Sequence, residues 1–277
     1  MIYDCFLFYD EEMMLKLRLE TLYEHVDKFV IVESTHSFTG NPKPLNFKPE
    51  NFSQFKDKII YIVFDQAPDA DAWQNESDTR NAIMRGLTGA SDEDLILIAD
   101  VDEIYDPKIL ARINPRRLCT IIYQNFYNYQ FNLQVLNMDG SPRLCKLPKA
   151  VSYYNLTHFF KSEPETLRNV KRKDSFIRKS WFKWQWLKMN TAVIKDGGWH
   201  FSWIMTPEQI SKKMSSISHT EYDLPEFNNE EHIIKCINNG QDIWARDRKF
   251  IKKQLTEKEF PNPLVDSKEK YKDFIID

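Results

Sequence analysis

The sequence predicts an α/β fold in which a mostly parallel central sheet is flanked by helices and followed by a β-rich half. Short apolar strands alternate with amphipathic helices over the first hundred residues. From Leu118 onward the pattern becomes aromatic and strand-like. The chain has 277 residues and 42% hydrophobic content, so it can bury one large core.

Six elements are expected in the first hundred residues, in the order strand, helix, strand, strand, helix, strand. The strands are compact apolar runs at 2–8, 28–32, 58–64 and 95–99. The helices are expected at 11–25, where Met14, Leu17 and Leu22 recur near a helical period, and at 73–87. This order predicts parallel pairing, with the connecting loops gathered at one edge of the sheet.

In the second half, the segment IIYQNFYNYQFNLQVL predicts strands, and helices are expected again only at 207–217 and 229–238. No low-complexity linker or internal repeat divides the chain, so a single domain over 1–277 is expected. Within it we distinguish two halves, 1–117 and 118–252. The charged tail, 253–277, is expected to pack along the surface or to fray.

Composition argues against several classes of protein. The net charge of -3 does not favour a polyanionic partner such as nucleic acid for the whole molecule. Neither G-x-G-x-x-G nor G-x-x-x-x-G-K-[ST] occurs, which argues against a dinucleotide site and a P-loop. No signal-peptide pattern and no run of about 18 apolar residues occurs, so we expect no transmembrane helix and a cytoplasmic location. The cysteines are far apart and are expected to be free thiols: Cys5, Cys119, Cys145 and Cys236.

The most informative segment is LILIADVDEIYD, residues 95–106, where a buried strand ends in acidic residues. A side-chain period of two places Asp100 and Asp102 on one face at the strand's carboxyl end, where open α/β sheets bind ligands. Paired carboxylates there suit Mg²⁺ or Mn²⁺ carrying a substrate diphosphate. The alternative is a solvated corner between strand and loop.

Five segments follow one another along residues 3–203: YDCFLFYDEEMMLKLRLETLYEHVDKFVIVES, FTGNPKPL, W-x-x-E-x-x-x-R from Trp73 to Arg80, LILIADVDEIYDP, and DGGWHFSW from Asp196 to Trp203. Together they resemble glycosyltransferase family 17, the β-1,4-mannosyl-glycoprotein β-1,4-N-acetylglucosaminyltransferases. The resemblance implies a GT-A-like fold, a UDP-sugar donor (UDP-N-acetylglucosamine), a glycan or glycoconjugate acceptor, and an inverting transfer assisted by Mn²⁺ or Mg²⁺. It makes 1–117 the nucleotide-sugar-binding half and 118–252 the half that binds acceptor and completes the metal site.

Two other classes stay open. A metal-dependent phosphoryl hydrolase or nucleotidyltransferase would use the same acidic pair together with a second pair of carboxylates, and no such second pair is evident. A non-catalytic sugar- or nucleic-acid-binding module would need no metal.

By the resemblance, the cation ligands are Asp100, Asp102 and His200, with Asp102 favoured as a direct ligand. His200 is alternatively a packed histidine beneath Trp199 and Trp203, and His219 is the competing ligand.

Three further residues have paired interpretations. Glu33 accepts hydrogen bonds from ribose or uracil, or caps a loop. Arg80 reaches the base or the phosphates, or forms an ion pair with Glu76 one helical turn away. Glu103 orients the metal ligands, or caps a helix starting near Pro107, and the cap is favoured.

The sequence does not locate the catalytic base that an inverting transfer needs. Glu231, at the head of a helix, and Glu221 are the candidates, by analogy with the position of acids in inverting GT-A enzymes. The aromatic run 123–131 either contacts the acceptor or forms an ordinary core strand. The basic and aromatic stretch 168–195 is a solvated face, a phosphate-binding surface or a nucleic-acid groove.

Overall fold

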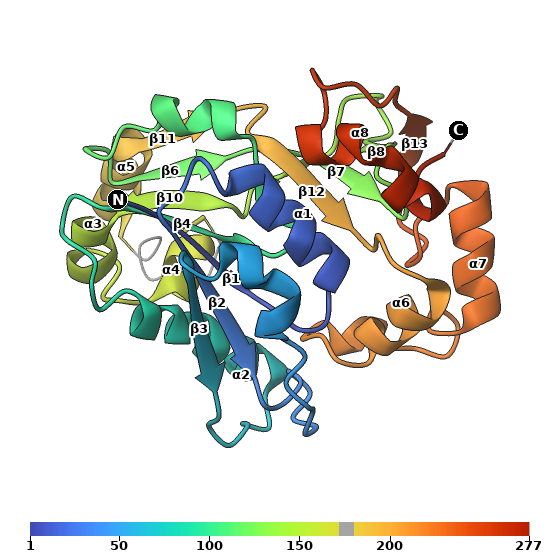
Figure 1. The fold of residues 1–277 in the computed structure, drawn as a ribbon, viewed down its shortest axis with the longest axis horizontal. Coiled ribbons are helices and arrows are strands. Elements are labelled where there is room, and N and C mark those ends of the chain that lie inside the picture. The colour runs from blue at the N-terminus through green and yellow to red at the C-terminus, as the bar shows by residue number, and fades with distance from the viewer. Residues whose placement is uncertain (172–179, 277) are drawn as a thin grey trace.

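The computed structural model describes residues 1–171 and 180–276 and contains two β-sheets (Figure 1). The larger sheet has the strand order β11-β6-β10-β4-β1-β2-β3. The pairs β1–β2, β1–β4, β2–β3 and β6–β11 are parallel, and β10 is antiparallel to both of its neighbours. Its strands are β1 (Ile2–Leu7), β2 (Lys28–Ser34), β3 (Ile59–Phe64), β4 (Leu95–Asp100), β6 (Cys119–Ile122), β10 (Lys149–Ser152) and β11 (Thr191–Ile194).

The second sheet has the order β13-β8-β7-β12-β5, and β9 pairs with β7 beside this path. The pair β7–β12 is parallel and the other pairs are antiparallel. Its strands are β5 (Glu103–Tyr105), β7 (Gln124–Asn128), β8 (Leu133–Leu136), β9 (Leu144–Cys145), β12 (Gly198–Ser202) and β13 (Lys249–Lys252). Because β5 follows β4 after a two-residue turn, the two sheets meet at the acidic segment.

Helices cover both faces of the larger sheet. Figure 1 shows α1 crossing one face and α6 and α7 grouped beyond β12. The α-helices are α1 (Glu12–Leu22), α2 (Ala72–Asn81), α3 (Tyr153–His158), α4 (Pro164–Arg168), α5 (Trp181–Asn190), α6 (Pro207–Met214), α7 (Glu230–Asn239) and α8 (Asn262–Asp266). The 3-10 helices are η1 (Pro49–Phe55), η2 (Ala82–Gly86), η3 (Pro107–Arg112), η5 (Thr220–Tyr222) and η6 (Lys268–Phe274).

Alternation along the central strands divides the core into two layers. Phe6 and Leu97 face α1 and pack with Leu15 and Leu19. The neighbouring positions, including Cys5, Ile96 and Ile98, pack on the other side with residues of η2, α3 and α4. Both sides of β1 and β4 are therefore buried, which explains their nearly continuous apolar sequences.

The predicted fold class, α/β with a mostly parallel sheet and flanking helices, is confirmed. The predicted helix at 73–87 is α2 followed by η2, and the later helices were predicted within three residues of their ends. Helices α3, α4 and α5 were not predicted, because two are only five or six residues long and α5 carries aromatic residues around most of its circumference. The larger sheet takes β6, β10 and β11 from beyond residue 118, so it spans both halves of the chain.

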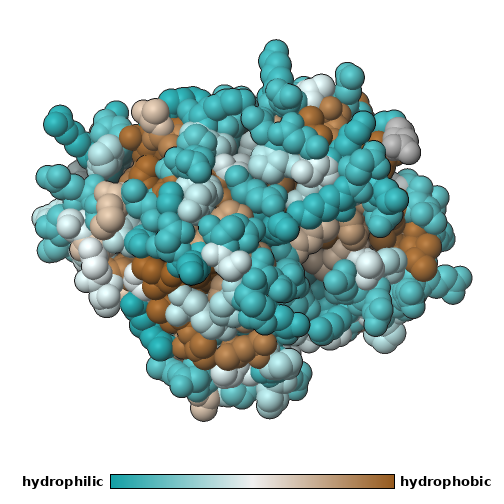
Figure 2. All heavy atoms as spheres, in the orientation of Figure 1, coloured by the Kyte–Doolittle hydropathy of each residue, from teal (hydrophilic) through white to brown (hydrophobic). Residues whose placement is uncertain are grey.

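The C-terminal segment 253–276 packs against the rest of the fold and does not fray. Phe260, Leu264 and Tyr271 are buried in the core layer that contains α1. All four cysteines are free and buried, as expected. Among the described residues, no helix is long and apolar enough to cross a membrane. On the face in Figure 2, hydrophilic side chains predominate and apolar ones form smaller patches.

Candidate active site

The acidic segment turns sharply directly after the predicted strand, where the sequence was expected to keep a side-chain period of two through Asp100 and Asp102. Strand β4 ends at Asp100, and Val101 and Asp102 form a turn before β5 begins at Glu103. The turn breaks the strand period, so Asp100 and Asp102 do not share one strand face. They contact different partners.

A buried ion pair between α1 and β1 stabilises this turn. Arg18, on α1, pairs with Asp4, on β1, and both side chains are fully buried. The same guanidinium donates hydrogen bonds to the backbone carbonyls of Asp100 and Glu103, at 2.8 and 2.9 Å. It thereby satisfies carbonyl groups that the turn leaves without a strand partner.

Asp100 binds two arginines. Its Oδ1 accepts a hydrogen bond from Arg80 Nη2 at 2.9 Å, and its Oδ2 accepts one from Arg168 Nη2 at 2.5 Å. Arg80 also pairs with Glu76, as the alternative interpretation predicted, and with Glu165. Both oxygens of Asp100 are therefore occupied by protein donors.

Glu103 does not cap a helix, which corrects the favoured interpretation. The N-cap of η3 is Asp106, whose side chain accepts a hydrogen bond from the Lys108 amide. Glu103 is completely buried and binds Arg168 through both oxygens, at 2.7 and 2.9 Å. Although burial alone would raise it, Arg168 lowers the pKa of Glu103 well below its ordinary value.

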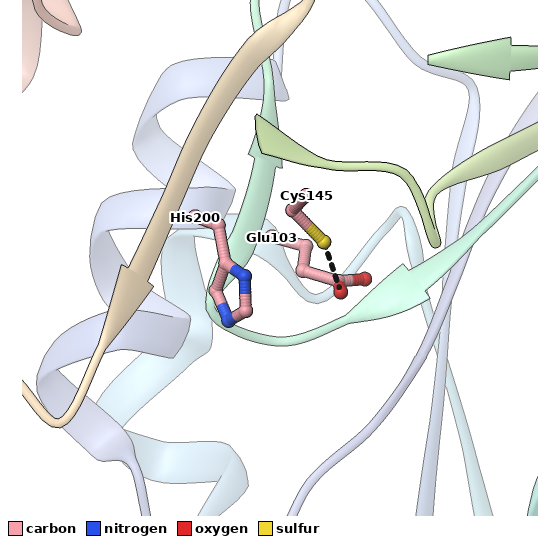
Figure 3. Close-up of side chains that lie close together, drawn as sticks. All are labelled: Glu103, Cys145 and His200. Carbon is pink, nitrogen blue, oxygen red and sulfur yellow. Dashed lines mark hydrogen bonds between the residues drawn. The ribbon is translucent and has the colours of Figure 1, made fainter. Parts of the chain in front are cut away.

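Glu103, Cys145 and His200 converge from β5, β9 and β12 (Figure 3). Among the described residues, they are the group of three potential ligands whose donor atoms lie within 4.8 Å of one another. The Cys145 thiol donates to Glu103 Oε1 at 3.2 Å, and burial raises its pKa. Because Arg168 already neutralises Glu103, this cluster is a hydrogen-bonded support and not a suitable set of cation ligands.

Asp102 and His200 fit a divalent cation better. Oδ1 of Asp102 lies 3.7 Å from Nε2 of His200, and its Oδ2 lies 4.0 Å from Nζ of Lys213. These separations are longer than hydrogen bonds, and the two side chains are 13% and 14% exposed. Carboxylate oxygen and imidazole nitrogen at this spacing suit Mn²⁺ or Mg²⁺, whose bonds to such atoms are about 2.1 Å long.

These groups border a cavity of about 650 Å³. The carboxyl ends of β1, β2 and β4 contribute one side, including Tyr9, Ser34 and Asp100, and α2 adds Arg80. The other side comes from the second half and includes Phe126, Trp203 and Trp244. The cavity therefore lies between the two halves, with Asp102 and His200 among its lining residues.

Glu33 has the loop-capping role, and the structure thus favours that alternative over nucleotide binding. Its carboxylate is fully buried and accepts hydrogen bonds from Lys43 Nζ, the amides of Asn46 and Phe47, and the Tyr61 hydroxyl. These four donors occupy the carboxylate and fix the loop after β2. Glu33 is not among the residues that line the cavity.

The two acids predicted as the base lie in different surroundings. Glu231, on the first turn of α7, is exposed and does not line the cavity. Glu221 is also outside the lining, but its Oε1 accepts a hydrogen bond from His219 Nδ1 at 2.8 Å. His219 does line the cavity and packs edge-on against Trp73.

The aromatic run 123–131 divides between the two interpretations. Phe126 lines the cavity and its ring lies 4.2 Å from that of His200, whereas Tyr127, Tyr129 and Phe131 are buried in the core. Of the basic stretch 168–195, residues 172–179 lie outside the described residues. Among the described residues of this stretch, Arg168 pairs with the acidic segment.

Sequence reasoning missed the buried cations Arg18 and Arg168. The signal for Arg18 was a charge within the apolar periodicity of α1, at a position flanked by Leu17 and Leu19. Arg168 gave no comparable signal, because its partners are 65 and 68 residues away in the sequence.

The mostly parallel sheet, with an acidic turn at the carboxyl end of β4 that opens into the cavity, defines a GT-A-like α/β fold. The chain belongs to glycosyltransferase family 17, whose family model matches residues 1–139.

Two similar relatives are beta-1,4-mannosyl-glycoprotein 4-beta-N-acetylglucosaminyltransferases of rat and human. Each is 23% identical over 231 residues, which is 76% of this chain and 41% or 42% of the relative. The chain therefore spans about two fifths of their length. A solved structure of a putative glucose-1-phosphate thymidylyltransferase from Bacillus anthracis, in complex with a sucrose, is 10% identical with a TM-score of 0.36, covering 70% of this chain and 87% of that one.

Proposed function

We propose that this chain is an inverting, divalent-cation-dependent glycosyltransferase that moves N-acetylglucosamine from UDP-N-acetylglucosamine to a glycan hydroxyl. Family membership and the names of the relatives support the class of reaction. The single observation that carries the proposal is the proximity of Asp102 and His200 at the cavity.

Asp102 and His200 would hold the cation. When bound, it neutralises the charge that develops on the departing diphosphate. Asp100 holds Arg80 and Arg168 beside the same turn, and the carboxylates around these two guanidinium groups balance their charge. This network separates the two aspartates by role, with Asp102 toward the cation and Asp100 toward the arginines.

For the acceptor hydroxyl, the proposed base is His219. Its Nδ1 donates to Glu221, which leaves Nε2 as the nitrogen able to accept a proton. Glu221 is then a positioning residue that fixes the tautomer and stabilises the imidazolium. Glu231 stays a prediction without a contact to the cavity.

The test is UDP binding with and without Mn²⁺, combined with release of UDP from UDP-N-acetylglucosamine. Asp102→Asn keeps the shape of the side chain but removes its charge, so we expect metal-dependent UDP affinity to fall at least roughly tenfold. The melting temperature should stay close to that of the wild type, because the partners of the Asp102 side chain among the described residues, His200 and Lys213, lie 3.7 and 4.0 Å away.

The matched control is Asp92→Asn, which changes an exposed aspartate in the loop before β4. It should bind UDP like the wild type. If UDP affinity proved indifferent to both chelator and Asp102→Asn, the cation site would be refuted. If UDP-sugars neither bound nor released UDP, the transferase assignment would be refuted.

A further inference from the structure

Three arginines next to strands of the second sheet line the cavity. Arg143 precedes β9, and Arg246 and Arg248 precede β13. One carboxylate accompanies them. Asp242, whose side chain is fully buried, pairs with Arg246 at 2.8 Å and with Arg248 at 3.0 Å.

The charges of this arginine cluster do not balance. Beside the acidic turn, Arg80 and Arg168 are matched by nearby carboxylates that include Asp100 and Glu103. Among the described residues, the three cations of the arginine cluster have one paired acid, Asp242, which binds Arg246 and Arg248. Burial lowers the pKa of Arg248 to about 10, which is the response expected of a cation that lacks sufficient counter-charge.

Of the three arginines, Arg143 has the fewest polar partners for its positive charge. Among the described residues, its guanidinium forms no ion pair, and its Nε is buried without a hydrogen-bond partner. The group instead lies 5.6 Å from the centre of the Phe126 ring, and the Arg248 guanidinium lies 6.0 Å from the same ring. Because a planar guanidinium binds phosphate and carboxylate through two parallel hydrogen bonds, an incoming oxyanion is the fitting partner.

The location relates the cluster to the reaction centre. The Phe126 ring, which both arginines approach, also packs against His200 at 4.2 Å between ring centres. A molecule bound at the arginine cluster would therefore lie one aromatic side chain away from the proposed cation site. It would occupy the acceptor side and not the side where β1, β2 and β4 end.

We propose that Arg143 and Arg248 bind an oxyanion, a phosphate or a carboxylate, carried by the acceptor sugar. This inference rests on the proposed function and specifies its acceptor class as acidic saccharides. Arg246 lies 4.3 Å from the Trp244 ring and shares Asp242, so it holds the cluster in place beside an aromatic surface suited to a sugar face.

The experiment measures the binding of three probes by calorimetry in the presence of saturating UDP and Mn²⁺, so that the donor site is filled. The probes are glucose 6-phosphate, glucuronic acid and glucose. We expect at least one anionic probe to bind more tightly than glucose. The stronger of the two anionic probes identifies phosphate or carboxylate as the source of the charge.

Arg143→Gln and Arg248→Gln should each weaken the anionic probe about tenfold while leaving the affinity for glucose and for UDP unchanged. Arg143→Lys should lose less, because it keeps the charge. Arg116→Gln, an exposed arginine between η3 and β6, is the matched control and should bind all probes normally. Melting temperatures identify any variant that fails to fold.

Two results would overturn the proposal. In the first, the anionic probes bind no better than glucose, or bind equally well to the wild type and the glutamine variants. In the second, the variants lose UDP affinity as well, which would assign the arginines to the donor diphosphate. If the wild type binds UDP normally and either of these results is obtained, only the acidic acceptor is refuted. The proposed function is then unaffected.

Discussion

Individual buried charges determine the shape of the candidate site. Arg18 joins α1, β1 and the acidic turn through one guanidinium, and Arg168 joins α4 to Asp100 and Glu103. A buried guanidinium is stable only when its donors are satisfied, so each fixes several partners at once. The positions of Asp100 and Asp102 therefore follow from residues outside the acidic motif itself.

The first prediction compares the two glutamates proposed from the sequence. Glu221→Gln removes the charge that orients His219, and we expect kcat for transfer to fall roughly tenfold, with little change in KM for the donor. Glu231→Gln, on exposed α7, is the matched control and should leave kcat unchanged. The reverse pattern would transfer the role to Glu231.

The second prediction concerns Lys149, which is buried on β10. Burial and the nearby Arg168 lower its pKa to about 7 from an ordinary 10.5, while Cys119, Cys145 and Glu103 act in the opposite direction. Its amine donates to the carbonyls of Lys146 and Leu147. Between about pH 7 and 10.5 the unfolded chain holds a proton that the folded chain does not, so this residue makes stability rise with pH.

Lys149→Met removes that titration. The free energy of unfolding of the wild type, minus that of the variant, should increase by up to roughly 1.4 kcal/mol per pH unit from pH 7.5 to pH 9.5. Below about pH 6 the difference should be constant and least favourable to the wild type. Urea unfolding at a series of pH values measures this difference. If the difference were constant across the range, the pKa of Lys149 would not be lowered in the folded protein.

How far the site could be predicted depends on the distance between partners in the sequence. The acidic segment and His200 could be proposed from the sequence because each lies in a compact motif, and the Glu76–Arg80 pair was predicted because it spans one helical turn. Arg168 and the arginine cluster were not predicted as parts of the site, because their contacts bring together segments that are far apart in the sequence. Glu103 was misassigned because its burial depends on β5, a three-residue strand with no clear sequence signal.

At the scale of elements, strand β12 positions His200 in the site, because it pairs with β5 on one side and with β7 on the other. The first residue of β12 must be a glycine for this strand to pair with β5. Gly198 has a φ of +134°, and an added Cβ would lie 2.1 Å from the Ile104 carbonyl oxygen. Gly198 therefore allows the backbones of β12 and β5 to approach closely.

Gly198→Ala should lower the free energy of unfolding by about 2–5 kcal/mol, because it combines backbone strain with a clash against backbone that cannot move aside. Gly89→Ala is the matched control, since a Cβ added there would have nothing within 4 Å and its backbone is not left-handed. It should change stability by less than about 0.5 kcal/mol. Equal effects of the two substitutions in denaturant unfolding would contradict the β5–β12 pairing.

The elements of the first half were predicted well for a physical reason. Strands β1, β2 and β4 are buried on both faces, so their apolar runs are unbroken and bounded by polar residues. Past residue 118 the strands are short, and some of them, such as β11 and β13, are partly exposed. Helices α3 and α4 are only six and five residues long, and are capped by Ser152 and begun by Pro164, respectively. Such elements are stabilised by tertiary packing more than by their own sequence pattern.

At the scale of the whole molecule, the C-terminal segment contributes side chains to the core layer that also contains residues of α1. Phe131 donates its amide to the Phe274 carbonyl at 2.8 Å, and Asn132 exchanges hydrogen bonds with the Ile276 backbone at 2.8 and 2.9 Å. Leu264, on α8, is fully buried in the same core layer as Leu15 and Leu19. A segment that looked like a charged tail is therefore an integral part of the fold.

The last prediction tests this packing with two leucines. Leu264→Ala should lower the free energy of unfolding by about 2–5 kcal/mol, because it leaves a cavity between α8 and α1. Leu45→Ala, where the side chain is 42% exposed, makes the same chemical change on the surface and should cost less than about 0.5 kcal/mol. Cooperative unfolding of both variants by heat and urea provides the comparison. If Leu264→Ala were as stable as Leu45→Ala, the segment would not pack against α1 in solution. Residues 253–276 would then not belong to the hydrophobic core.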